Sequence, residues 1–169
     1  MKKVTFLPAF LFVILLIACN KNEEEENLPD DSSFYALKDD SEWITTSSWT
    51  TYSRNTGEIV VTGVKRDSVY YQEEWLQFHF KLSDIQESDE LTPFTSKWYY
   101  IIGGDAISNS FVMDTTFQNQ LIITALDTAN KQISGTFQVK LMGDNRHSSQ
   151  NETMLYENGV FNINYTEVE

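Results

Sequence analysis

The segment Trp75-Leu76-Gln77-Phe78-His79-Phe80-Lys81-Leu82 decides the fold class of this chain. Its even-numbered residues, from Leu76 to Leu82, are apolar, and the odd-numbered residues from Gln77 to Lys81 are polar. Side chains alternate between the two faces of a β-strand, so a period of two predicts a strand with one buried face. Trp75 then lies opposite the apolar face of its own strand.

The chain on either side has the same character, because Thr, Val, Ile and aromatic residues dominate it and no long stretch has the period of a helix. We expect strands at 42–52 and 58–65, and a hairpin formed by 120–126 and 132–141. Asn158-Gly159 predicts a tight turn. Residues 34–169 are therefore expected to form one all-β domain. We favour a single antiparallel β-sandwich of about eight or nine strands, with a small β-barrel as the alternative.

The N-terminal segment predicts a cleaved signal peptide over residues 1–18. A positive start, Met1-Lys2-Lys3, precedes an apolar run from Phe6 to Ala18 that is too short to span a bilayer. Leu16-Ile17-Ala18-Cys19 resembles the bacterial lipobox, which implies that Cys19 is acylated and becomes the first residue of the mature protein. An ordinary signal peptide with a chance cysteine is the alternative. A lipid anchor would attach the chain to a membrane without spanning it.

Residues 19–33 are expected to be a disordered acidic tether, because they contain many like charges and almost no apolar residues. The run Lys21-Asn22-Glu23-Glu24-Glu25-Glu26 resembles the surface-export signal of Bacteroidetes lipoproteins. That resemblance implies an outer-membrane protein facing the cell exterior. A plain spacer on the periplasmic side is the other interpretation.

The charge of the chain argues against some partners. The full sequence has 12 Lys and Arg against 25 Asp and Glu, and cleavage after Ala18 removes Lys2 and Lys3, which leaves a net charge of −15. Nucleic-acid binding needs clustered basic residues, so no nucleic-acid partner is expected. The single cysteine, Cys19, leaves the folded domain without a thiol for a disulfide or a metal site.

Several segments resemble small Bacteroidetes lipoproteins of unknown function, the DUF6252-like families. They are Phe34-Tyr35-Ala36-Leu37, Glu42-Trp43, Ile122–Asp127, Ile133–Phe137 and Asn158–Ile163. These motifs are structural, since they combine strand alternation with a glycine. The resemblance implies a secreted, lipid-anchored, all-β domain, and it carries no catalytic residues.

No sequence motif indicates catalysis, a cofactor or a metal. The two histidines, His79 and His147, have no second ligand at a suitable spacing. A pair of facing carboxylates could still hydrolyse a glycan, although sequence does not show their separation. We therefore expect that the protein is not an enzyme.

Aromatic side chains are the most suggestive feature for binding. The candidate ligand-binding residues are Trp43, Trp49, Trp75, Trp98, Tyr99 and Tyr100. Alternation means that they cannot all be buried on one face, and flat rings on a sheet can stack on sugars or anchor a protein. The alternative is that the two sheets and the long loops of a sandwich cover them all.

Three motifs, Asp67-Ser68-Val69, Asp114-Thr115-Thr116 and Asp127-Thr128-Ala129, resemble the O-glycosylation acceptor of Bacteroidetes. They imply sugar on Ser68, Thr115 and Thr128. The leading functional hypothesis is a lipid-anchored envelope module that binds a glycan or a partner protein without catalysis. A small secreted glycan hydrolase and a structural surface-assembly component are the alternatives.

Overall fold

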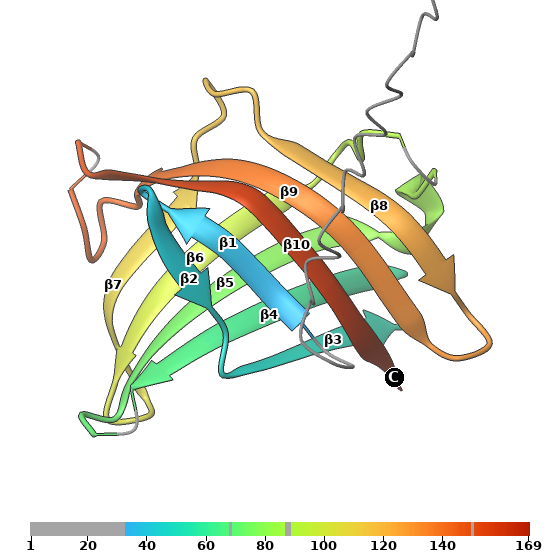
Figure 1. The fold of residues 1–169 in the computed structure, drawn as a ribbon, viewed down its shortest axis with the longest axis horizontal. Helices are drawn as coiled ribbons and strands as arrows, with labels where there is room; N and C mark the ends of the chain where they lie inside the picture. Colours follow the sequence, from blue (N-terminus) through green and yellow to red (C-terminus); the bar gives the residue numbers. More distant parts are fainter. Residues whose placement is uncertain (1–32, 68, 87–88, 150) are drawn as a thin grey trace, which may run out of the picture.

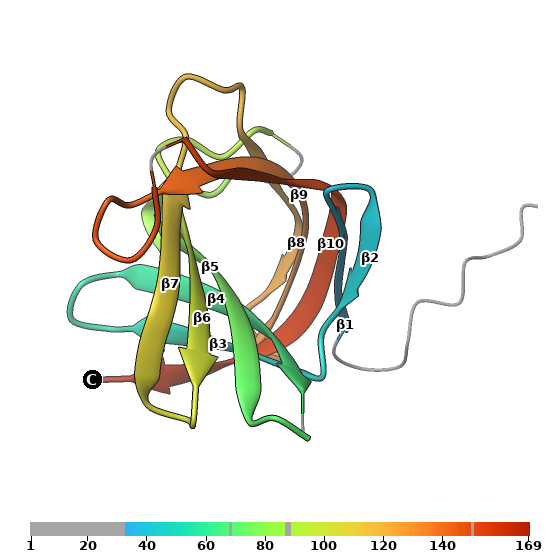
Figure 2. The same cartoon turned by 90° about the vertical axis from the view of Figure 1, so that its left-hand side faces the viewer.

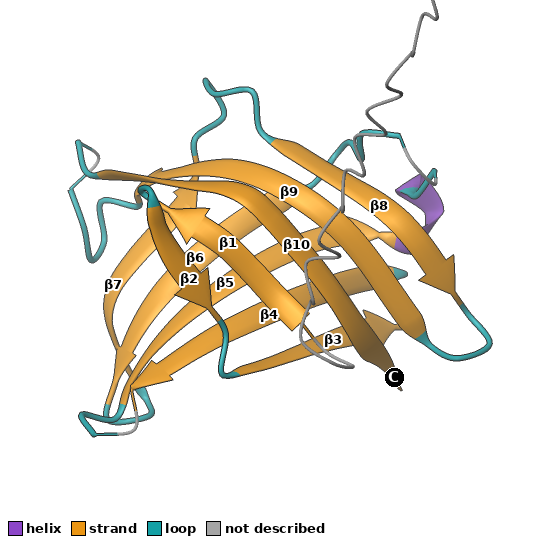
Figure 3. Ribbon diagram, viewed as in Figure 1, coloured by secondary structure: helices purple, strands orange, loops and turns teal. Residues whose placement is uncertain are grey.

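The computed structural model describes residues 33–67, 69–86, 89–149 and 151–169. The signal peptide, Cys19 and nearly all of the expected tether therefore lie outside the described residues. The strands are β1 Ser33–Lys38, β2 Ser41–Ile44, β3 Ser47–Ser53, β4 Glu58–Asp67, β5 Gln72–Lys81, β6 Thr95–Ile102, β7 Ala106–Met113, β8 Gln120–Asp127, β9 Gln132–Gly143 and β10 Thr153–Val168. A 3-10 turn, Leu82–Asp84, follows β5 (Figure 3). No helix in the described part of the chain is long and apolar enough to cross a membrane.

The ten strands form one sheet that closes into a ring. β10 pairs with β9 along one edge, and its other edge is shared by β1 and, further along, by β3. β9 in turn shares its second edge between β7 and β8. The ring of paired strands is thus β3-β4-β5-β6-β7-β9-β10, with the hairpin β1–β2 and strand β8 as additions. Figure 2 shows the ring from one end, with the curved halves of the sheet on either side of its centre.

Two curved halves of the sheet face each other across the core. In Figure 1, β8, β9 and β10 cross in front of β4, β5 and β6. The all-β class is confirmed, and the packing of the two halves is sandwich-like while the continuous pairing corresponds to the barrel alternative. The described residues form ten strands instead of the expected eight or nine. The pairing of β10 with β3 is parallel, so the sheet is mixed and not wholly antiparallel.

The apolar face of β5 lies inside the ring, as its alternation predicts. Leu76 and Phe78 are fully buried there, and Phe34 of β1 stacks on Phe78 at 6.2 Å between ring centroids. Phe34 comes close to β4 because residue 63 is glycine, where a Cβ would lie 2.8 Å from the Phe34 ring. Burying such rings contributes about 2 to 3 kcal/mol each.

Two local expectations were wrong. Residues 42–52 form two strands, because the chain leaves β2 at Thr45 and Thr46, whose backbone N–H groups donate to the carbonyls of Phe34 and Val64. Asn158-Gly159 is not a turn between strands. It is a bulge inside the continuous strand β10, where the register against β9 shifts and Asn158 has a positive φ of 50°. Both edges of β10 are hydrogen-bonded to neighbours, and this pairing keeps the strand extended through the bulge.

Candidate functional site

Strand alternation divides the six candidate aromatic residues into two groups of three. The pairing and burial of the strands place Trp43, Trp98 and Tyr100 on the inner side of the ring and Trp49, Trp75 and Tyr99 on the outer side. Two of the six candidates offer almost no surface to a ligand. Trp43 and Trp98 are only 1% and 5% exposed, because inward positions of β2 and β6 pack into the core.

The outer group forms a continuous surface, which we call the outer aromatic face and define as Trp49, Trp75 and Tyr99. Trp75 and Tyr99 are direct cross-strand partners on β5 and β6. Trp49 of β3 meets Trp75 edge-on, with 5.2 Å between ring centroids and 86° between ring planes. Trp49 is 36% exposed, and the other two are half-buried. The face therefore runs across β3 to β6 and presents rings to solvent.

A hydrogen bond fixes the orientation of the Trp75 ring. The indole N–H donates to Oε2 of Glu73 at 2.7 Å, and the other carboxylate oxygen accepts from Nε of Arg66 at 2.7 Å. The Trp75 indole, and after it Arg66, hold the pKa of Glu73 below its usual value against the opposing effect of burial. Glu73 is thus an anion at neutral pH, and it holds one aromatic side chain of the outer face in a fixed position.

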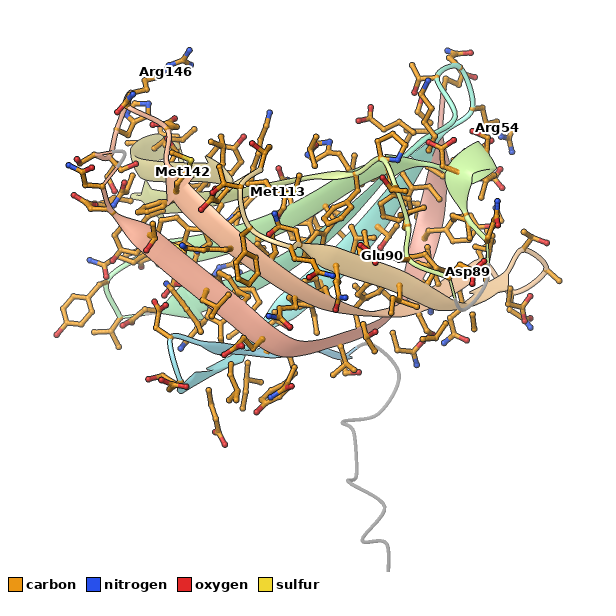
Figure 4. The ribbon with its side chains drawn as sticks, turned by 90° about the horizontal axis from the view of Figure 1, so that it is seen from above. Arg54, Asp89, Glu90, Met113, Met142 and Arg146 are labelled. Atoms are coloured by element: carbon orange, nitrogen blue, oxygen red, sulfur yellow. The ribbon has the colours of Figure 1, made fainter. Side chains whose placement is uncertain are left out.

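A hollow adjoins the outer aromatic face at Tyr99 and contains a group of basic side chains. It has a volume of about 330 Å³ and is lined by Lys97, Tyr99, Ile107, Ser110, Phe111, Val112, Asp144, Arg146 and His147. Lys97, Arg146 and His147 are exposed. Figure 4 shows Arg146 in the loop between β9 and β10, at the opposite end of the molecule from Arg54. We call Lys97, Arg146 and His147 with this hollow the basic hollow.

The carboxylate of Asp144 shapes the loop that carries two of these basic residues. Ser110 Oγ donates to its Oδ2 at 2.5 Å, and the backbone N–H groups of Arg146 and His147 donate to its Oδ1 at 2.8 and 3.0 Å. Burial opposes ionisation, but these hydrogen bonds prevail and lower the pKa of Asp144. Because both oxygens of Asp144 are already hydrogen-bonded, it fixes the loop and leaves the basic side chains facing solvent.

The inner group surrounds an ion pair. Nζ of Lys38 lies 2.5 Å from Oε2 of Glu74, and the Trp43 indole N–H donates to the same oxygen at 3.2 Å. Glu73 and Glu74 are therefore adjacent in sequence and project to opposite faces of β5. They cannot act together on one bond, since a hydrolytic pair must face each other across the substrate.

The histidines lie apart from each other. His79 is on the outer side of β5, with Nδ1 3.1 Å from a carboxylate oxygen of Glu58, whereas His147 belongs to the basic hollow. Among the described residues, no group of three His, Cys, Asp or Glu side chains is close enough to hold a metal ion.

Two of the expected glycosylation sites lie in exposed turns. Thr115 follows β7 and Thr128 follows β8. The preceding residues, Asp114 and Asp127, accept hydrogen bonds from backbone N–H groups two residues further on. Ser68 lies outside the described residues. Glycosylation at all three positions remains a prediction.

Sequence reasoning missed the basic hollow. Lys97 and Arg146 are almost fifty residues apart, and only the approach of the β9–β10 loop to β6 and β7 brings them together. The spacing of basic residues in the sequence gives no sign of this. By contrast, the three outer aromatic residues follow from strand alternation once the strands are placed.

No protein-family model matches this chain, and no match was found among curated proteins or solved structures. The resemblance to DUF6252-like lipoproteins therefore stays a prediction. What the site can do must be argued from its own geometry.

Proposed function

We propose that this protein is a lipid-anchored envelope module without catalytic activity, and that its outer aromatic face binds a glycan that carries acidic groups. Cys19 would hold it at the outer membrane, at the cell surface or otherwise on the periplasmic side. The observation that carries the binding proposal is that Tyr99 both pairs with Trp75 across β5 and β6 and lines the basic hollow.

The aromatic face suits the apolar side of sugar rings. Trp49, Trp75 and Tyr99 present large, rigid surfaces whose burial by a ligand costs little side-chain entropy. Trp75 is already oriented by Glu73, so less ordering is needed on binding. Such a face binds with a favourable hydrophobic contribution and needs no catalytic group.

The basic hollow adds a preference for acidic sugars. The chain carries 25 acidic and 12 basic residues, so a cluster of exposed basic side chains beside aromatic rings stands out against the rest of the surface. Carboxylate or sulfate groups on a glycan that lies on the outer aromatic face would reach Lys97 and Arg146. Complementary charge of this kind raises association rates and selects among ligands.

A glycan array tests the proposal. The purified full-length protein should bind glycans that contain uronic acid or sulfate, and Trp75→Ala should weaken this binding at least about tenfold, which is about 1.4 kcal/mol. Tyr70→Ala removes an exposed aromatic side chain outside the face and serves as the matched control. Binding that is equally strong in Trp75→Ala, with both variants folded by circular dichroism, would refute this site.

The two alternatives have less support. A hydrolase needs a facing carboxylate pair, and the neighbouring acids Glu73 and Glu74 point to opposite faces of β5. An assembly component that acts by strand addition needs a long free edge. The edge strand β2 has only four residues, and Leu91 donates to the carbonyl of Leu121 on the edge strand β8.

A further inference from the structure

The inner side of the ring contains a second hollow, at the ends of β4, β5 and β6. Its volume is about 390 Å³, and its lining consists of Lys65, Arg66, Asp67, Gln72, Glu74 and Tyr100. We call it the mouth of the ring. By strand alternation, Gln72 and Glu74 continue the inner face on which Leu76 and Phe78 are buried, so polar side chains replace apolar ones as β5 reaches this end.

An ion pair lies at the inner boundary of the mouth. The side chains of Lys38 and Glu74 are each 22% exposed, and their hydrogen bond of 2.5 Å links β1 to β5. The bonds from Lys38 and Trp43 both end on Oε2 of Glu74. Among the described residues, Oε1 accepts no hydrogen bond, so this oxygen remains available to a donor.

An aromatic wall stands beside this ion pair. The rings of Trp98 and Tyr100 stack with 6.1 Å between centroids, and Nζ of Lys38 lies 4.6 Å from the centre of the Trp98 ring. Tyr100 is half-buried and lines the mouth, and its hydroxyl donates to Oε1 of Gln72 at 2.5 Å. This wall gives the mouth one flat apolar side, while its other sides carry donors and acceptors.

Two buried donors adjoin the same residues. Trp98 and Tyr156 are 5% and 0% exposed, and burial raises the pKa of the Tyr156 hydroxyl while a hydrogen bond with the Trp98 side chain opposes that rise. Tyr156 packs edge-on against Trp43, with 5.4 Å between ring centroids.

The charges of the mouth balance. Lys38 is paired with Glu74, Arg66 is paired with Glu73 on the outer side, and Lys65 and Asp67 contribute one charge of each sign to the lining. A charged ligand would therefore be repelled by a side chain of its own charge next to each side chain of opposite charge that attracts it. A hydroxyl group both donates and accepts, so it can bond to an ammonium and a carboxylate without a net charge being buried.

We propose that the mouth of the ring binds one neutral monosaccharide or a cyclic polyol of similar size. One face of the sugar ring would lie against Tyr100, and its hydroxyls would bond to Glu74 and Gln72, which line the hollow. The volume of about 390 Å³ falls in the range of small-molecule sites. This site is separate from the outer aromatic face, since the two lie on opposite sides of the sheet.

Calorimetric titration of the full-length protein tests the proposal. The probes are glucose, galactose, mannose and N-acetylglucosamine, each titrated separately. We expect saturable binding of at least one of them and a loss of at least tenfold in affinity in Glu74→Gln. Glu42→Gln, which changes an exposed acid on β2 in the same way, should bind as the unaltered protein does.

Three outcomes are decisive. Absence of saturable binding for all four sugars would overturn the proposal, and so would unchanged affinity in Glu74→Gln. If Glu74→Gln does not fold, Tyr100→Phe takes its place, because it keeps the ring and removes the hydroxyl bond to Gln72; an affinity lowered severalfold supports the site and an unchanged affinity refutes it. Failure of the outer aromatic face would show in titrations with acidic glycans and would leave these results unaffected.

Discussion

Glu74 and Trp75 are neighbours in β5, yet the carboxylate of Glu74 is bonded to Lys38 inside the ring while the indole of Trp75 packs against Trp49 on the outside. One step along the strand thus separates the two surfaces to which binding is assigned. The alternation that builds the core also determines which aromatic residues a ligand can reach.

Glu73→Gln should weaken binding at the outer aromatic face without unfolding the protein. The substitution removes the negative charge that accepts from the Trp75 indole and pairs with Arg66, so the ring loses its fixed orientation. We expect a loss of about threefold to tenfold in affinity for an acidic glycan, corresponding to about 0.7 to 1.4 kcal/mol. Glu42→Gln is the matched control, and equal affinities of the two variants in calorimetric titration would contradict the assigned role of Glu73.

Removing the basic side chains of the basic hollow should weaken the binding of acidic ligands only. The double variant Lys97→Ala, Arg146→Ala should bind acidic glycans about tenfold more weakly, and its affinity should change less with salt, because screened charge pairs are lost. Lys81→Ala, an exposed lysine outside the hollow, is the control. An unchanged salt dependence in the double variant would show that the basic hollow does not contact the ligand.

Gly135→Ala should destabilise the fold. A Cβ at this position would lie 2.5 Å from the Phe161 ring and 2.6 Å from the backbone carbonyl oxygen of Ile122, and the backbone has little freedom to move. Overpacking of this kind costs about 1 to 3 kcal/mol. Urea unfolding measures the loss. Thr136→Ala, at the neighbouring half-buried position, should cost less than about 1 kcal/mol, and equal losses in the two variants would argue against the close approach at Gly135.

Stability should fall in acid. Hydrogen bonds, chiefly those from the Trp75 indole, Thr116 and the backbone of Asn130, lower the pKa values of Glu73, Asp114 and Asp127 in the folded state, and the ordinary values are 4.5 for Glu and 3.8 for Asp. The unfolded chain therefore binds protons at higher pH than the folded one. The stabilisation is present above the ordinary pKa and is lost as the pH falls through the lowered one. Urea unfolding from about pH 6 to about pH 3.5 should show a decreasing free energy of unfolding; a constant value would contradict these shifts.

Cys19 should carry lipid. The lipobox-like segment before it predicts cleavage after Ala18 and acylation of the cysteine, which together give a membrane-bound mature chain. Mass spectrometry of the protein expressed in a bacterium should find an acylated N-terminal cysteine, and Cys19→Ala should move the protein out of the membrane fraction. An unmodified Cys19, or membrane binding retained in Cys19→Ala, would refute the anchor.

The sequence predicts local alternation well, because a buried face requires every second residue to be apolar. The strand around Phe78, the hairpin of β8 and β9 and the all-β class follow from this requirement. Long-range pairing does not follow from it. Strand β10 pairs with β3 in parallel, and β1 and β3 share one edge of β10. Both arrangements depend on how the whole sheet curls.

The same limit explains the two local errors. Asn158-Gly159 is compatible with both a turn and a bulge, and the choice between them depends on β9, which is hydrogen-bonded to β10 before and after this point. The inner and outer positions of Trp98 and Tyr99 could be predicted relative to each other but not relative to the core. The basic hollow could not be predicted, since it is formed by a loop that folds over distant strands.

The most direct test of the central claim is the indole N–H spectrum of the protein, in which each of the four tryptophans gives one signal that a Trp→Phe variant can assign. Addition of an acidic oligosaccharide that the glycan array selects should shift the signals of Trp49 and Trp75 in a saturable way and leave those of Trp43 and Trp98 unchanged. A spectrum in which Trp49 and Trp75 do not respond at saturating ligand would contradict the assignment of glycan binding to the outer aromatic face.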